Sequence, residues 1–70
     1  MSSIVKVIEV IAQSDKSFSD AVRNGVREVG KTVHDVKSAW VDNFTCHVEK
    51  GEITEYRANL RVSFVVEGHK

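Results

Sequence analysis

The stretch from residue 53 to residue 66 alternates apolar and polar residues more regularly than any other part of the chain. Successive side chains of a β-strand point to opposite faces, so this pattern predicts a strand with one apolar and one polar face. The apolar face carries Thr54, Tyr56, Ala58, Leu60, Val62, Phe64 and Val66, and the polar face carries Glu55, Arg57, Asn59, Arg61 and Ser63. We expect the first face in the core and the second against solvent, a partner or a ligand.

Length and cysteine content predict one small domain over residues 1–70 that associates with copies of itself. A 70-residue chain buries only about 60% of its unfolded surface and is marginally stable as a monomer. Cys46 is the only cysteine and no Cys/His group has zinc spacing, so disulfides and zinc cannot supply the missing stability. Self-association is therefore expected. A free thiol, with no signal peptide or long apolar run, predicts a cytoplasmic protein without membrane contact.

The charge balance argues against nucleic-acid binding. Ten basic and ten acidic residues cancel, whereas nucleic-acid binding normally requires a broad positive field.

Two further elements precede the 53–66 strand in the first half of the chain. Residues 4–12 form a predicted strand that is apolar on both sides and therefore covered on both sides, one side by a helix and the other by another subunit.

A helix is predicted to follow, with Ser17 as its N-cap and Asp20 three residues later. Helical spacing then runs from Phe18 through Ala21, Val22, Val26, Val29, Val33 and Val36. Gly25 lies in this apolar stripe, where it would allow the helix to approach the sheet closely. His34 lies near the expected end of the helix, where its ring could interact with the helix dipole.

Residues 38–49 form the second predicted strand, joined to the third by a hairpin loop over residues 50–52. The expected apolar-face pairs are Val48 with Thr54, Cys46 with Tyr56, and Phe44 with Ala58. An unbroken ladder would bury the Asp42 carboxylate, so we predict a β-bulge near Asp42 and Asn43. The bulge turns Trp40 and Ser38 to the polar face. The alternatives are Trp40 as an ordinary core residue or as a contact between subunits.

The element order strand, helix, strand, strand predicts an α+β fold of β-α-β-β type. A right-handed crossover and a hairpin place the third strand centrally in a three-stranded antiparallel sheet, packed with one face on the single helix. The other face stays open, and we expect the ligand or partner there.

The chain resembles the dodecins, small flavin-binding proteins that assemble as hollow homododecamers. The likeness rests on VKVIEVIAQSDKSFSDAV, on KTVHDV at the helix end and on EYRANLRVSF near the C-terminus. The resemblance implies a flavin stacked between tryptophans across a two-fold axis, with a glutamine at the flavin edge. Here Ser38 takes the family's tryptophan position, Trp40 lies two residues further on, and Arg57 takes the glutamine position. A calcium-binding type of dodecin-like protein also lacks the stacking tryptophan.

Three functions are compatible with these residues. The first is storage of a flavin, riboflavin or FMN, in a homododecameric shell, with Trp40, Arg57, Ser38 and Arg61 as binding residues. The second is a dodecin shell without flavin that binds an ion such as calcium or another metabolite, or has only a structural role. The third, an enzyme using Cys46, His47 and His34, is disfavoured because neighbours on a strand point to opposite faces. Cys46 is then a buried apolar group. Arg57 and Arg61 are equally suited to ligand contact and to ion pairs with Glu55, Asp42 or a neighbouring subunit.

Overall fold

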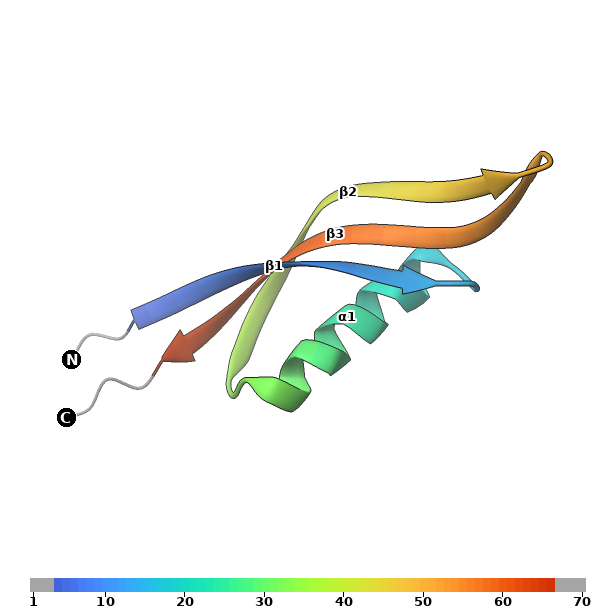
Figure 1. The fold of residues 1–70 in the computed structure, drawn as a ribbon. Coiled ribbons are helices and arrows are strands. Elements are labelled where there is room, and N and C mark those ends of the chain that lie inside the picture. The colour runs from blue at the N-terminus through green and yellow to red at the C-terminus, as the bar shows by residue number, and fades with distance from the viewer. Residues whose placement is uncertain (1–3, 67–70) are drawn as a thin grey trace.

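The computed structural model describes residues 4–66, which form three strands and one helix (Figure 1). The elements are β1 (Ile4–Ser14), α1 (Phe18–Thr32), β2 (Val36–Glu49) and β3 (Glu52–Val66). The sheet order is β1-β3-β2, and β3 runs antiparallel to both neighbours. The predicted α+β fold, with a central third strand and one helix, is confirmed.

The strand register separates the sheet into a helix face and an open face. Directly paired residues share a face, and Ala12–Ala58, Val10–Leu60 and Ile8–Val62 all pair on the face that α1 covers. The opposite face is called the open face below. Its paired positions are Val5, Val7, Glu9, Ile11 and Gln13 on β1, Arg57, Asn59, Arg61 and Ser63 on β3, and Ser38, Trp40, Asn43 and Thr45 on β2.

The predicted N-cap of α1 is confirmed, but the helix ends earlier than its apolar spacing suggested. The Ser17 side chain accepts a hydrogen bond from the Asp20 amide at 3.0 Å. Val33 is the extended C-cap residue, and Asp35 has a φ of 59°, which the short polar side chain of aspartate tolerates. The prediction that helical spacing continues to Val36 was therefore wrong, because Val36 already begins β2 and pairs with Phe64.

The core is a thin layer of small and branched residues between α1 and the sheet. Its buried members are Ala12, Ala21, Val29, Ala58, Leu60 and Val62. Gly25 allows the close contact between the two layers, as predicted. An added Cβ at Gly25 would lie 2.7 Å from Cδ1 of Leu60 and 2.8 Å from Cβ of Ala12. Both distances are shorter than any normal carbon–carbon contact.

The β2–β3 hairpin closes with a two-residue turn in place of the expected three-residue loop. Lys50 and Gly51 both have positive φ, 52° and 79°, which matches the twist of the flanking strands. A register shift follows His47, so Val48 pairs with Ile53 and the predicted Val48–Thr54 pair was wrong. The other two predicted pairs, Cys46–Tyr56 and Phe44–Ala58, are confirmed.

The predicted bulge in β2 is also confirmed. Val41 pairs with Leu60 and Asn43 pairs with Asn59, so Asp42 is the extra residue between them. The shift in parity places Ala39 and Val41 on the helix face and turns Trp40 to the open face.

The end of the hairpin extends past the helix (Figure 1), so α1 covers only the part of its helix side that is nearest to Phe18. Phe18 reaches both strands there, with ring centroids 4.8 Å from Phe44 and 4.9 Å from Tyr56. Cys46 nevertheless is exposed, so its predicted burial was wrong for the single subunit. The reason is geometric, since a 15-residue helix is only about 22 Å long.

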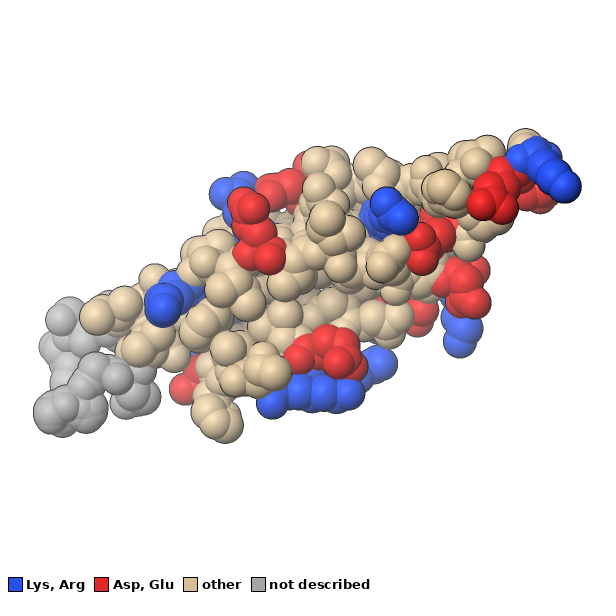
Figure 2. All heavy atoms as spheres, in the orientation of Figure 1, with Lys and Arg blue, Asp and Glu red and all other residues tan. Residues whose placement is uncertain are grey.

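Acidic and basic side chains are interspersed on the molecular surface, and the viewed face carries no broad patch of one sign (Figure 2). Within residues 4–66, α1 lacks the length and the apolar character needed to cross a membrane.

Substitution of the interlayer glycine tests the packing. Gly25→Ala should lower the free energy of unfolding by about 1–3 kcal/mol, because the methyl group overpacks a tight core. Equilibrium unfolding in denaturant measures the change.

Gly30→Ala in the same helix is the matched control. Nothing lies within 4 Å of a Cβ added at Gly30, so this variant should gain up to about 1 kcal/mol from helix propensity. Equal stability of the two variants would contradict the close helix–sheet contact.

Candidate functional site

The open face arranges its side chains in rows that cross all three strands. One row is Glu9, Arg61 and Trp40, contributed by β1, β3 and β2 in that order. The adjoining row towards the hairpin is Ile11, Asn59 and Asn43. Because residues in one row lie on neighbouring strands, groups far apart in sequence become adjacent on this face.

Trp40 stands on the open face and is not a core residue. It is 48% exposed, a large fraction for a large aromatic side chain. The guanidinium carbon of Arg61 lies 5.7 Å from the ring centroid, within the range of a cation–π contact. Arg61 therefore contacts the Trp40 ring while much of the ring remains accessible to solvent.

Arg61 is in turn fixed by the bulge residue Asp42. Arg61 Nε donates to both carboxylate oxygens, at 3.1 and 3.0 Å, and Nη2 donates to Oδ1 at 2.8 Å. The fork geometry of arginine matches a carboxylate in this way. Hydrogen bonds and charge from Asp42 raise the pKa of Arg61 above its usual value. The extra residue in β2 thus supplies the partner that orients Arg61 and, through it, Trp40.

The structure brings together some of the predicted site residues and separates another. Trp40 and Arg61 are directly paired, and Ser38 lies in the next row, where its hydroxyl is 2.7 Å from that of Ser63. Arg57 lies four positions from Arg61 along β3, about 13 Å at strand spacing. Arg57 instead donates from Nε and Nη2 to Glu55 at 3.3 and 3.2 Å. Both arginines thus form the ion pairs weighed as alternatives from the sequence.

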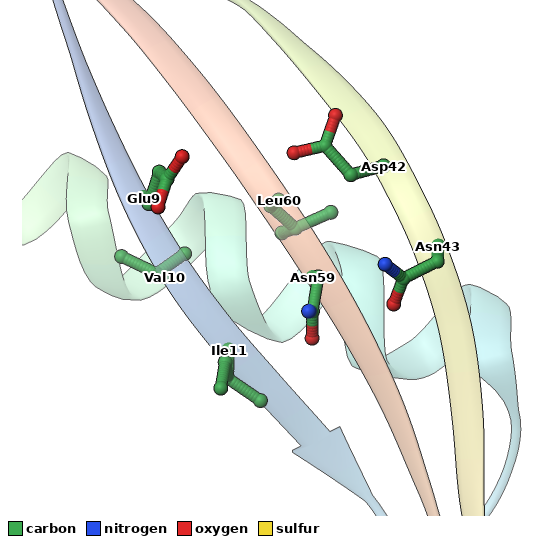
Figure 3. Close-up of a pocket in the computed structure, with 7 residues that line it drawn as sticks. All are labelled: Glu9, Val10, Ile11, Asp42, Asn43, Asn59 and Leu60. Atoms are coloured by element: carbon green, nitrogen blue, oxygen red, sulfur yellow. The ribbon is translucent and has the colours of Figure 1, made fainter.

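A depression of about 390 Å³ lies beside the Trp40 row, at the middle of the sheet (Figure 3). Its lining residues are Glu9, Val10, Ile11, Asp42, Asn43, Asn59 and Leu60. The sequence placed Asn59 on the face where a ligand is expected, but it assigned no ligand contact to Glu9 or Asn43. The signal that could have found these two is the strand register, since Glu9 pairs with Arg61 and Asn43 pairs with Asn59 in the adjoining row.

The described residues form neither a metal site nor a cysteine–histidine pair. Among residues 4–66, no three His, Cys, Asp or Glu side chains lie close enough together to hold a metal ion. Cys46 and His47 belong to opposite faces of β2, and the His47 ring contacts Glu49 at 3.3 Å. A thiolate–imidazolium pair is thus absent from this strand.

Comparison with known families decides the classification. The family model for dodecin matches residues 4–67, nearly the whole chain. The chain belongs to the dodecin family. Among curated protein sequences, none matches this dodecin chain.

Solved dodecin structures agree with the fold. The dodecin from Streptomyces davaonensis superposes with a TM-score of 0.92 at 19% identity, over 97% of this chain and all of that one. The dodecin from Streptomyces coelicolor gives a TM-score of 0.91 at 24% identity, over 96% of each chain. The calcium dodecin of Mycobacterium tuberculosis, described as having a calcium-binding site, is 32% identical with a TM-score of 0.82 over 97% of each chain.

Matched substitutions of the two open-face arginines test the contact with Trp40. Arg61→Lys should shift the tryptophan fluorescence emission to longer wavelength, because the guanidinium no longer covers the ring and water replaces it. Arg57→Lys should leave the emission unchanged, because Arg57 is paired with Glu55 and lies four positions from Arg61 along β3. Steady-state emission spectra of the unliganded proteins measure both. Equal spectra for the two variants would rule out the Arg61–Trp40 contact.

Proposed function

We propose that this dodecin is a binding and storage protein that holds a flavin, riboflavin or FMN, against Trp40 in a homododecameric shell. Catalysis forms no part of the proposal. The observation that carries it is the exposed Trp40 ring, which stands on the open face beside a depression of small-molecule size. An isoalloxazine ring stacks well on such an indole surface.

The amides in the neighbouring row support the same role. The edge of a flavin pyrimidine ring presents both donors and acceptors, and an arginine can only donate. Asn59 and Asn43 carry side-chain amides, which donate and accept, and both line the depression. We assign to them the edge contact that a glutamine makes in the flavin-binding type of dodecin. Arg57 is then a structural residue paired with Glu55.

Uncovered apolar surface supports the assembly. On β1, Ile4, Val5, Val7 and Ile11 are 60%, 56%, 48% and 65% exposed in the single subunit. Adjacent exposed apolar residues of this kind mark contact surfaces between proteins. In the proposed assembly, other subunits pack against β1 and the hairpin and cover these apolar side chains. The cytoplasm is the proposed compartment, in keeping with the free Cys46 thiol.

Titration of riboflavin and FMN into the purified protein tests the flavin proposal. Stacking on Trp40 should quench flavin fluorescence strongly, and native mass spectrometry should show twelve subunits. Trp40→Ala should weaken flavin binding by at least about tenfold, the cost of one lost aromatic stack, while the assembly mass is retained.

Trp40→Phe is the matched control, because it keeps an aromatic face and should retain part of the affinity. Loss of the twelve-subunit mass in Trp40→Ala would show that Trp40 is an intersubunit contact. Absence of quenching in the unmodified protein would overturn flavin storage.

Calcium binding is the second candidate, favoured by the 32% identity to the calcium dodecin of Mycobacterium tuberculosis. Carboxylate and amide oxygens of Glu9, Asp42, Asn43 and Asn59 line one depression, and calcium prefers oxygen ligands. Asp42 would have to leave Arg61 to take part.

If calcium binds here, millimolar calcium should raise the midpoint of thermal unfolding, because a ligand that binds only the folded state stabilises it. Glu9→Gln should abolish the rise, and Glu28→Gln on α1, outside this depression, should not. A midpoint that is insensitive to calcium excludes this second role on the open face.

A further inference from the structure

The charges beside Trp40 are arranged unfavourably for a phosphate. Arg61 is the central positive group of its row, and it has a carboxylate on either side, Asp42 from β2 and Glu9 from β1. Asp42 bonds the Nε and Nη2 atoms of Arg61, and the Glu9 charge also acts on the guanidinium. The positive charge is thus more than compensated within the row.

An incoming phosphate would have to displace a tethered competitor. Asp42 is part of the same chain, so its effective concentration at Arg61 is far higher than that of a free ligand. Arg57, the other arginine of the open face, already donates to Glu55 from Nε and Nη2. Neither arginine therefore offers an uncompensated charge to an anion.

The depression itself suits hydroxyl groups. Glu9 and Asp42 present carboxylate oxygens, which accept hydrogen bonds, and the amides of Asn43 and Asn59 both accept and donate (Figure 3). A polyol chain can donate hydrogen bonds to the two carboxylates, while the amides serve the edge of the ring. A phosphate, with about 1.5 to 2 negative charges at neutral pH, is repelled by the same carboxylates.

We infer that, if Trp40 binds a flavin as proposed above, the open face selects a flavin with an uncharged polyol chain over its phosphate ester, and that Asp42 determines this selectivity. The ligand class is thus the riboflavin type, and the FMN type is disfavoured by the Asp42 and Glu9 carboxylates and by the occupied guanidinium of Arg61.

Parallel titrations with riboflavin and FMN test the inference through the ratio of their dissociation constants. Riboflavin should bind about tenfold more tightly at low salt, and the ratio should shrink at high salt, since the discrimination is electrostatic. Asp42→Asn removes one negative charge and releases the Arg61 guanidinium. It should shift the ratio by about tenfold in favour of FMN.

Two further variants complete the experiment. Glu9→Gln should shift the ratio in the same direction as Asp42→Asn. Glu28→Gln is the matched control, because Glu28 is likewise ion-paired, with Lys31 at 2.8 Å, but lies on α1. Its ratio should equal that of the unmodified protein.

The outcomes separate this inference from the proposed function. Tighter binding of FMN than of riboflavin, or a ratio in Asp42→Asn equal to that in Glu28→Gln, overturns the selectivity and leaves flavin storage standing. Failure of both flavins to bind overturns flavin storage and, with it, this inference.

Discussion

An unpaired carboxylate buried between a sheet and a helix costs several kcal/mol, and the path of β2 avoids that cost by accommodating one extra residue. Asp42 occupies the extra position, and the parity of the strand changes there. Before the change, Ala39 and Val41 point to the helix face and Trp40, between them, points to the open face. The carboxylate, freed from the core, bonds Arg61 on the open face. A single avoided burial thus shapes both faces of the sheet.

The two faces have different physical roles. The helix face is thin, because Gly25 and Ala12 let α1 approach the sheet closely, and its contacts are small apolar groups. Such a core is sensitive to added volume. The open face carries half-exposed side chains whose order comes from cross-strand pairs, above all Trp40, Arg61 and Asp42. Its residues can therefore change with little effect on the fold.

Arg61 illustrates why an arginine in a candidate site is an ambiguous signal. From the sequence, it is equally suited to a ligand carbonyl, a phosphate or a neighbouring carboxylate, because its guanidinium serves all three. In the structure it bonds Asp42 and lies against the indole ring of Trp40. In the proposed flavin site, its role is to position that ring and to withhold its charge from a phosphate. The neutral amides of Asn43 and Asn59, of which the sequence pointed only to Asn59, line the depression in the row next to Trp40.

Local patterns were sufficient for most of the fold: the alternation in residues 53–66 predicted β3, the Ser17 cap began α1, and the carboxylate argument located the bulge. The family could be recognised from the same stretches. The helix end was not predictable from apolar spacing, because Val33 and Val36 fit a helix and a strand equally, and Asp35 changes the chain direction through its positive φ. The predicted burial of Cys46 was also wrong for the single subunit. An apolar face indicates that other residues cover it, but not whether those residues belong to the same subunit. Which charges neutralise one another was decided by the tertiary structure, because the register of three strands brings Glu9, Arg61 and Asp42 together from distant parts of the sequence.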